Sequence, residues 1–256
     1  MSRFEEYSER YRNIRLRRRD GILEMTLHTD GEPLHWNQGT NHEFISACHE
    51  IGADPENRVV IVTGAGDTFC SEVDYESFGD FFGSARLWDR IYREGRRVPL
   101  DFLDVEIPMI AAVNGPARVH PELPVMCDIV LASDTAVFQD MLHFMSGVVP
   151  GDGVQVIWPL LLGMNRGRYF LLTGQELSAH EALDLGVVNE VLPRDALLAR
   201  AWELAEELTA KPYLTLRYSR VLLTQELQRL LRDGVGYGLA LEGIAALDAT
   251  PDSKGG

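Results

Sequence analysis

The stretch Met109 to Val130, MIAAVNGPARVHPELPVMCDIV, carries the alternation that decides the fold of this chain. It begins with an apolar run that ends at Asn114-Gly115-Pro116, which is typical of a buried strand closed by a turn. A helix is expected over 122–127 and a second buried strand over 129–132. A strand, a helix and a strand in such quick succession predict a βαβ unit and a parallel sheet.

The same alternation continues on both sides of this stretch. Residues 14–19 and 22–27 alternate apolar and polar side chains around Asp20-Gly21, so they predict a β-hairpin. Further strands are expected over 59–63, 137–138 and 187–191, and helices over 41–51, 85–103, 158–162, 166–173, 178–186, 196–210, 214–232 and 238–247. The pattern predicts a single α/β domain with a helical C-terminal extension.

Composition excludes several classes of protein. The chain has 256 residues, of which 45% are hydrophobic and 25% charged, as in ordinary globular proteins. Its net charge is −15, and Lys211 and Lys254 are the only lysines, so nucleic acid is not an expected partner. No apolar run is long enough to span a membrane, and the N-terminus lacks the apolar core of a signal peptide.

The cysteines indicate a reducing compartment. Cys48, Cys70 and Cys127 are odd in number and widely separated, so they suggest no disulfide framework. Together with the lack of a signal peptide, they predict a cytoplasmic location.

Four histidines recur every seven residues, which raises the possibility of a metal site. They are His28, His35, His42 and His49. However, His28 ends a predicted strand while His42 and His49 belong to a predicted helix, so one face cannot hold all four. The preferred interpretation is exposed or capping histidines, and no metal is expected.

His143 and Asp152 flank a segment that cannot be one regular helix. The segment 144–151 is apolar and contains two glycines and a proline, so it could fold back and bring the two side chains together. A carboxylate at one imidazole nitrogen would raise the basicity of the other, which could then deprotonate water. Spacing alone also permits two unrelated surface residues.

His120 and Glu242 are two further candidates for which the pattern leaves alternatives open. His120 lies between a predicted strand and a predicted helix, a junction that often borders a ligand crevice, but surface-loop histidines are also common. Glu242 interrupts an apolar helical segment, so it is either buried beside a partner such as a histidine or on a solvated face.

Three stretches together resemble the crotonase (enoyl-CoA hydratase/isomerase) superfamily. They are 59–78 (VVIVTGAGDTFCSEVDYESF), 109–130 as quoted above, and 138–191, which includes VVPGDG at 148–153. The resemblance covers residues 12 to 250. It implies the crotonase fold, an α/β fold with a stacked ββα spiral core over 1–195 and a helical C-terminal trimerisation region over 196–256, forming a single structural unit. It also implies a homotrimer or a dimer of trimers.

The chain departs from ordinary members of this superfamily at three positions. The second loop reads Arg118-Val119-His120-Pro121, with a histidine where glycines are usual, and 71–74 reads Ser-Glu-Val-Asp where a small Ala-Gly-Ala-Asp run is usual. Both backbone donors that polarise a thioester carbonyl are therefore in doubt. His143 stands in the place of the hydratases' second catalytic glutamate.

These departures are similar to the 6-oxocamphor hydrolase-like branch of β-diketone hydrolases. That resemblance implies retro-Claisen cleavage of a C–C bond in a cyclic or bicyclic 1,3-diketone, which gives a keto acid and requires no coenzyme A, other cofactor or metal. The diketone would be the small-molecule partner. The implied catalytic residues are His143, Asp152, His120 and Glu242, and the implied substrate- and oxyanion-binding residues are Trp36 and Val73.

The resemblance also leads to a hypothesis for each role. His143, oriented by Asp152, would activate water. His120 and the indole N–H of Trp36 would hold the enolate oxygen, while Glu242 would keep His120 protonated and aimed. A coenzyme A thioester-dependent enoyl-CoA hydratase/isomerase is the first alternative, and a non-catalytic crotonase-fold binding protein is the second.

Overall fold

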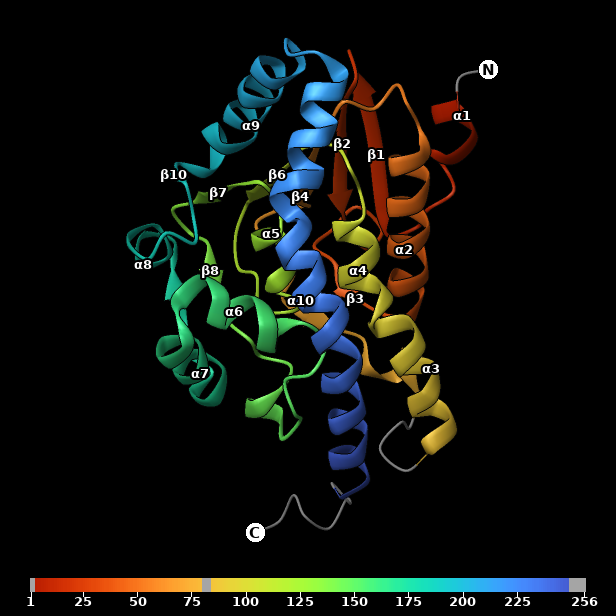
Figure 1. Ribbon diagram of the computed structural model, residues 1–256, viewed down its shortest axis with the longest axis vertical. Helices are drawn as coiled ribbons and strands as arrows, with labels where there is room; N and C mark the ends of the chain where they lie inside the picture. Colours follow the sequence, from red (N-terminus) through yellow and green to blue (C-terminus); the bar gives the residue numbers. More distant parts are fainter. Residues whose placement is uncertain (1–2, 80–83, 249–256) are drawn as a thin grey trace.

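The computed structural model describes residues 3–79 and 84–248 and confirms the predicted α/β class. Its central sheet has six strands in the order β1-β2-β4-β6-β7-β10 (Figure 1). β1 and β2 are antiparallel, and every later pair of neighbours in this sheet is parallel. The strands are β1 (Ile14–Arg19), β2 (Ile22–Leu27), β3 (His35–Trp36), β4 (Val59–Gly64), β5 (Glu72–Val73), β6 (Met109–Val113), β7 (Ile129–Ser133), β8 (Val137–Phe138), β9 (Leu177–Ser178) and β10 (Glu190–Leu192).

Helices cover both faces of the central sheet. They are α1 (Arg3–Tyr7), α2 (Gln38–Ala53), α3 (Ala85–Gly95), α4 (Arg97–Leu103), α5 (Glu122–Val125), α6 (Val154–Leu162), α7 (Met164–Thr173), α8 (Ala179–Asp184), α9 (Arg194–Thr209) and α10 (Tyr213–Asp248). In Figure 1, α10 runs along the molecule beside α4 and α6, and its C-terminal half lies beside α3.

Strand β4 shows why the sequences of these strands are unbroken apolar runs. Val60 and Val62 join the main core, while Val59 and Ile61 pack beneath α9 on the opposite face. Successive strand residues point to opposite faces, so a strand covered on both sides is apolar at every position. Because α9 packs on the sheet, the C-terminal helical region shares a core with the strands that precede it.

The C-terminal region differs from the prediction of two helices over 214–232 and 238–247. The two segments form one helix, α10, which includes Gly234, Gly236 and Gly238. A Cβ atom at Gly238 would lie 2.3 Å from the backbone oxygen of Gly151, so this glycine serves a close approach to the Pro150-Gly151 turn. Packing at this approach offsets the low helix propensity of glycine, so the helix continues through the segment 233–237 that the prediction left between two helices.

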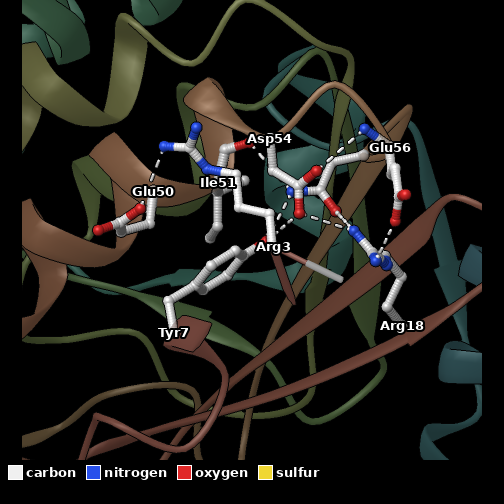
Figure 2. A network of polar contacts seen from close by, with 8 residues as sticks. Arg3, Tyr7, Arg18, Glu50, Ile51, Asp54 and Glu56 are labelled. Carbon is white, nitrogen blue, oxygen red and sulfur yellow. Dashed lines mark hydrogen bonds and ion pairs between the residues drawn. The ribbon is translucent and has the colours of Figure 1, made fainter. Parts of the chain in front are cut away.

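The N-terminal helix α1, which was not predicted, is held by a polar network shown in Figure 2. The Tyr7 hydroxyl donates a hydrogen bond to Asp54 Oδ2 at 3.1 Å, and Arg18 Nη1 donates to the same oxygen at 2.7 Å. Arg18 also pairs with Glu56, and Arg3 with Glu50. These contacts tie α1 and β1 to the C-terminal end of α2, so that helix is fixed at the end opposite the cavity described below.

Two further predictions concern features of the whole chain. None of the helices in residues 3–79 and 84–248 is both long and apolar enough to cross a membrane. All three cysteines are free and buried.

Candidate active site

The loops that follow the parallel strands are joined to one another at the carboxyl edge of the sheet. Asn114, directly after β6, accepts a hydrogen bond from the backbone N–H of Gly64 at 3.1 Å and donates to the backbone oxygen of Gly66 at 3.0 Å. A Cβ atom at Gly115 would overlap the backbone oxygen of Asp67, so only glycine allows this approach. The carboxyl edge is where α/β sheets most often bind ligands.

A cavity of about 590 Å³ opens beside these loops. All six residues predicted for the site lie in its wall, namely Trp36, Val73, His120, His143, Asp152 and Glu242. The other lining residues are mostly apolar: Asn41, Tyr75, Phe78, Gly79, Trp88, Ile91, Gly95, Leu142, Ser146, Val148 and Leu239. A largely apolar chamber with a few convergent polar groups is typical of a small-molecule site.

Helices α3 and α10 supply one wall of the cavity. Trp88 of α3 donates its indole N–H to the backbone oxygen of Leu239 in α10 at 3.0 Å. A Cβ atom at Gly243 would lie 2.0 Å from the Trp88 indole nitrogen, so the indole lies directly on the helix backbone. This wall is therefore built from two helices that pack on each other.

His120 adopts an unusual backbone conformation. Its φ angle is 48°, in the left-handed region that glycine adopts freely and other residues adopt at a cost of about 1 kcal/mol or more. Its Nδ1 lies 2.9 Å from Glu122 Oε1 and 3.3 Å from Asp152 Oδ2. Both carboxylates meet the same nitrogen, so Nε2 is left for other partners.

His143 is held differently. Its Nδ1 lies 2.7 Å from Asp140 Oδ1, and its Nε2 lies 3.5 Å from Asp152 Oδ1. The structure thus brings His143 and Asp152 together, but the carboxylate that orients the ring is that of Asp140. The expectation that Asp152 orients His143 is corrected in this respect, because the segment before His143 turns Asp140 back onto the ring.

The charges of this cluster shift the pKa values of its members. Burial lowers the pKa of His143, but the charges of Asp152 and Asp140 outweigh burial and hold this pKa well above its ordinary value. Burial likewise opposes the charged form of His120, yet Glu122 and Asp152 raise its pKa. Burial favours the neutral form of Asp152, but His143 and His120 hold its pKa below the usual range. These shifts favour the protonated form of both imidazoles and the ionised form of Asp152.

Glu242 does not make the contact with His120 that was expected of it. Glu122 occupies that position, two residues after the histidine. Glu242 projects from α10 toward Gly151 and has a buried Oε2 without a hydrogen-bond partner among the described residues. Burial raises the pKa of Glu242 to about 8, so its carboxyl is mainly neutral at pH 7.

Trp36 is placed by the pairing of β3 with β5, which sets it opposite Val73. Its indole ring lies 4.3 Å from the His120 ring, measured between centroids. Its N–H, however, donates to Asn41 Oδ1 at 2.7 Å. The indole N–H that was expected to hold the enolate oxygen thus already has an acceptor in this structure.

Sequence reasoning missed three groups of the site: Glu122, Asp140 and Asn41. Glu122 and Asp140 are completely buried, each beside its histidine. The available signal was a carboxylate two or three residues from each histidine within a mostly apolar segment, since a buried charge needs a partner. His42, by contrast, is an exposed residue outside the cavity, and it pairs with Glu94 at 3.0 Å.

His120, Glu122 and Asp152 also have the spacing of metal ligands. Their ligand atoms all lie within 4.8 Å of one another. His120 Nδ1 already lies at hydrogen-bond distance from Glu122 Oε1. A proton between these two atoms therefore accounts for their approach as well as a metal ion would. The geometry alone is compatible with either occupant.

Comparisons with known proteins place this chain in a family. Residues 17–236 match the family model described as enoyl-CoA hydratase/isomerase. A probable enoyl-CoA hydratase from Mycobacterium bovis is 30% identical over 203 residues, which cover 78% of this chain and 77% of that protein.

Two solved structures are similar over almost the whole chain. A β-diketone hydrolase from the cyanobacterium Anabaena, bound to (S)-3-oxocyclohexyl acetic acid, is 51% identical, with a TM-score of 0.93 over 95% of this chain and 97% of that one. An enoyl-CoA hydratase/isomerase from Mycobacterium paratuberculosis is 27% identical, with a TM-score of 0.87 over 95% of this chain and 96% of that one. The chain therefore has the crotonase fold and belongs to the crotonase superfamily, in its enoyl-CoA hydratase/isomerase family.

Proposed function

We propose that this protein is a β-diketone hydrolase that cleaves a C–C bond of a cyclic or bicyclic 1,3-diketone by a retro-Claisen reaction and releases a keto acid. The observation that carries the proposal is a pair of imidazoles on either side of Asp152, that of His143 buried and that of His120 partly buried, at the wall of a mostly apolar cavity. One imidazole can serve as a base and the other as an acid, which is what hydrolysis through an enolate requires.

The first step is attack of water on one carbonyl. His143, in its deprotonated form, accepts a proton from water while the water oxygen bonds to the carbonyl carbon. Asp140 at Nδ1 stabilises the imidazolium that results, and Asp152 adds a second negative charge on the Nε2 side. The raised pKa makes His143 a strong base whose basic form becomes more populated as the pH rises.

The second step breaks the C–C bond. The tetrahedral intermediate collapses to a carboxylic acid, and the electron pair of the broken bond becomes an enolate on the second carbonyl. Protonated His120 donates to that oxygen through Nε2, since its Nδ1 is engaged by carboxylates. The His143 imidazolium then returns its proton to the central carbon, which completes the turnover.

The similar Anabaena β-diketone hydrolase supports the class of substrate. It is 51% identical and binds a cyclic keto acid, and keto acids of this kind are what water produces when it opens a bicyclic 1,3-diketone. Aromatic and aliphatic side chains such as Phe78, Trp88 and Leu239 would face the hydrocarbon part of the substrate.

A coenzyme A-dependent hydratase or isomerase is the second candidate, and the enoyl-CoA hydratases among the relatives favour it. Two features of the chain oppose it. His120 stands where the backbone N–H of a glycine-rich loop would polarise a thioester, and His143 stands where a hydratase has a catalytic glutamate.

The two candidates can be separated with purified protein. We expect loss of a bicyclic 1,3-diketone, followed by its ultraviolet absorbance, to need no coenzyme A and to survive dialysis against EDTA. Crotonyl-CoA should be neither hydrated nor inhibitory. Efficient hydration of crotonyl-CoA without cleavage of any diketone would overturn the proposal, and loss of activity on chelation would assign a metal to the His120, Glu122 and Asp152 cluster.

A further inference from the structure

The part of the chain that the structure describes engages one of the two ends of the Asn41 side-chain amide. Asn41 Oδ1 accepts the indole N–H of Trp36 at 2.7 Å. Because an indole N–H can only donate, the amide oxygen has to face Trp36 and the NH₂ group has to point away from it. Trp36 therefore fixes the orientation of the Asn41 amide.

The indole that sets this orientation is itself rigid. Trp36 is only 2% exposed, and its ring packs against Phe44 on α2 and against His120. Its backbone is held by the pairing of β3 with β5. Turning the indole N–H toward a substrate would break these contacts and leave the Asn41 oxygen without its donor.

The other end of the amide has no hydrogen-bond partner within residues 3–79 and 84–248. Among the described residues, no atom accepts a hydrogen bond from Asn41 Nδ2, although Asn41 is only 6% exposed and lies in the wall of the cavity that contains His120. Nδ2 is not among the atoms enclosed by protein, in contrast to Glu122 Oε2 and Glu242 Oε2. Nδ2 is therefore within reach of an acceptor bound in the cavity.

We propose that Asn41 Nδ2 is a hydrogen-bond donor to the enolate oxygen, beside His120, and that Trp36 is the positioning residue that aims it. This inference rests on the proposed diketone cleavage. The amide is neutral and held in place before the reaction, so its hydrogen bond strengthens only as negative charge develops on the oxygen. Trp36 then acts through Asn41, in place of the direct donor role that the sequence suggested.

Kinetic variants test this assignment. Asn41→Leu removes the donor at similar size, and Asn41→Asp keeps an acceptor for Trp36 but presents a carboxylate to the enolate. Both should lose about a hundredfold in kcat on a bicyclic diketone, with little change in KM. Trp36→Phe should lose less, because the amide remains but is no longer aimed. Ser46→Asp, exposed on the same helix and outside the cavity, is the control for added charge and should match the native enzyme.

The double variant distinguishes positioning from direct donation. If Trp36 acts only through Asn41, the double variant of Asn41→Leu and Trp36→Phe should have the kcat of Asn41→Leu alone. A further loss in the double variant, or a larger loss in Trp36→Phe than in Asn41→Leu, would make Trp36 the direct donor and overturn the inference.

A binding measurement separates this inference from the proposed function. Cyclohexane-1,3-dione is an enolate at neutral pH and can be titrated by calorimetry, with cyclohexanone as its neutral counterpart. Asn41→Leu should weaken binding of the enolate about tenfold or more and leave cyclohexanone unchanged. If the native protein cleaves diketones while the Asn41 variants cleave and bind like it, the donor role fails alone. If no diketone is cleaved but the enolate binds through Asn41, the proposed function fails and the donor role stands.

Discussion

The two histidines of the cavity are the same residue type in similar surroundings, yet the carboxylate of Asp152 approaches different ring nitrogens in the two. Each has a completely buried carboxylate at Nδ1, Glu122 for His120 and Asp140 for His143, and each approaches Asp152. At His120, however, Asp152 is also on the Nδ1 side, whereas at His143 it faces Nε2. In the proposed mechanism this difference makes His120 a donor through its Nε2, which neither carboxylate approaches, and makes His143 the base.

Removing the base should produce the largest effect. His143→Ala should lower kcat by roughly two to four orders of magnitude, the usual range for a general base. His42→Ala, an exposed histidine outside the cavity, is the matched control and should keep the native rate. Steady-state kinetics on folded, purified variants measures both. A nearly normal rate for His143→Ala would move the role of base to another group.

Removing the fixed donor should have the next largest effect. His120→Gly should lower kcat about a hundredfold, since one donor to a developing oxyanion is lost. His120→Ala should lose the same activity but be less stable by about 1 kcal/mol, because alanine cannot relieve the positive φ angle. Urea unfolding compares the two variants. If KM rises while kcat is unchanged, His120 is a uniform binding contact.

Changing the carboxylate at His143 should shift the pH profile. Asp140 helps to raise the pKa of His143, so Asp140→Asn should lower that pKa, and the rising limb of kcat/KM should move to lower pH. The maximal rate should fall about tenfold, since the weaker base drives proton transfer less well. Glu122→Gln acts on His120 and should move this limb much less. Equal shifts in the two variants would remove the distinction between the two histidines.

The smallest effect on chemistry and a clear effect on stability are expected at Glu242. Burial raises the pKa of Glu242 to about 8 in the folded protein. As the pH rises above the ordinary pKa of a glutamate, the unfolded chain therefore loses this proton while the folded protein retains it. Native stability should therefore fall as pH rises to about 8, by a few kcal/mol in all. Glu242→Gln cannot ionise, so its advantage in melting temperature over the native protein should be small near pH 5 and largest near pH 8. An advantage that does not change with pH would contradict the buried, neutral carboxyl.

The sequence was sufficient to predict the strands and six residues of the cavity. Strands such as β6 were identified correctly because burial on both faces leaves an uninterrupted apolar run. The six predicted site residues share one cavity because they belong to segments beside the carboxyl edge of the central sheet: the short strands β3 and β5, loops, or the helix α10.

The sequence pattern did not predict the hydrogen-bond partners of the cavity residues. Which carboxylate meets which nitrogen depends on side-chain directions, so Glu122 was not distinguished from Glu242 as the partner of His120. The contact between Trp36 and Asn41 requires the chain to pass from β3 into α2 within a few residues, through the N-cap of Asn37. Gly234, Gly236 and Gly238 of α10 lie where a break between two helices was expected, and the turn at Gly151, which explains Gly238, is distant in sequence.

We expect the wall made by α3 and α10 to determine how activity is lost on heating. Trp88 fastens the two helices to each other, while the central sheet is packed between the main core and α9. Opening of the helix pair exposes the cavity without separating any strand of the sheet, so its free energy is smaller than that of global unfolding. Amide hydrogens of α3 should accordingly exchange with solvent faster than those of β4 and β6. Inactivation should precede the loss of β structure in a thermal ramp, and the enzyme should recover on cooling from temperatures at which its sheet is still intact.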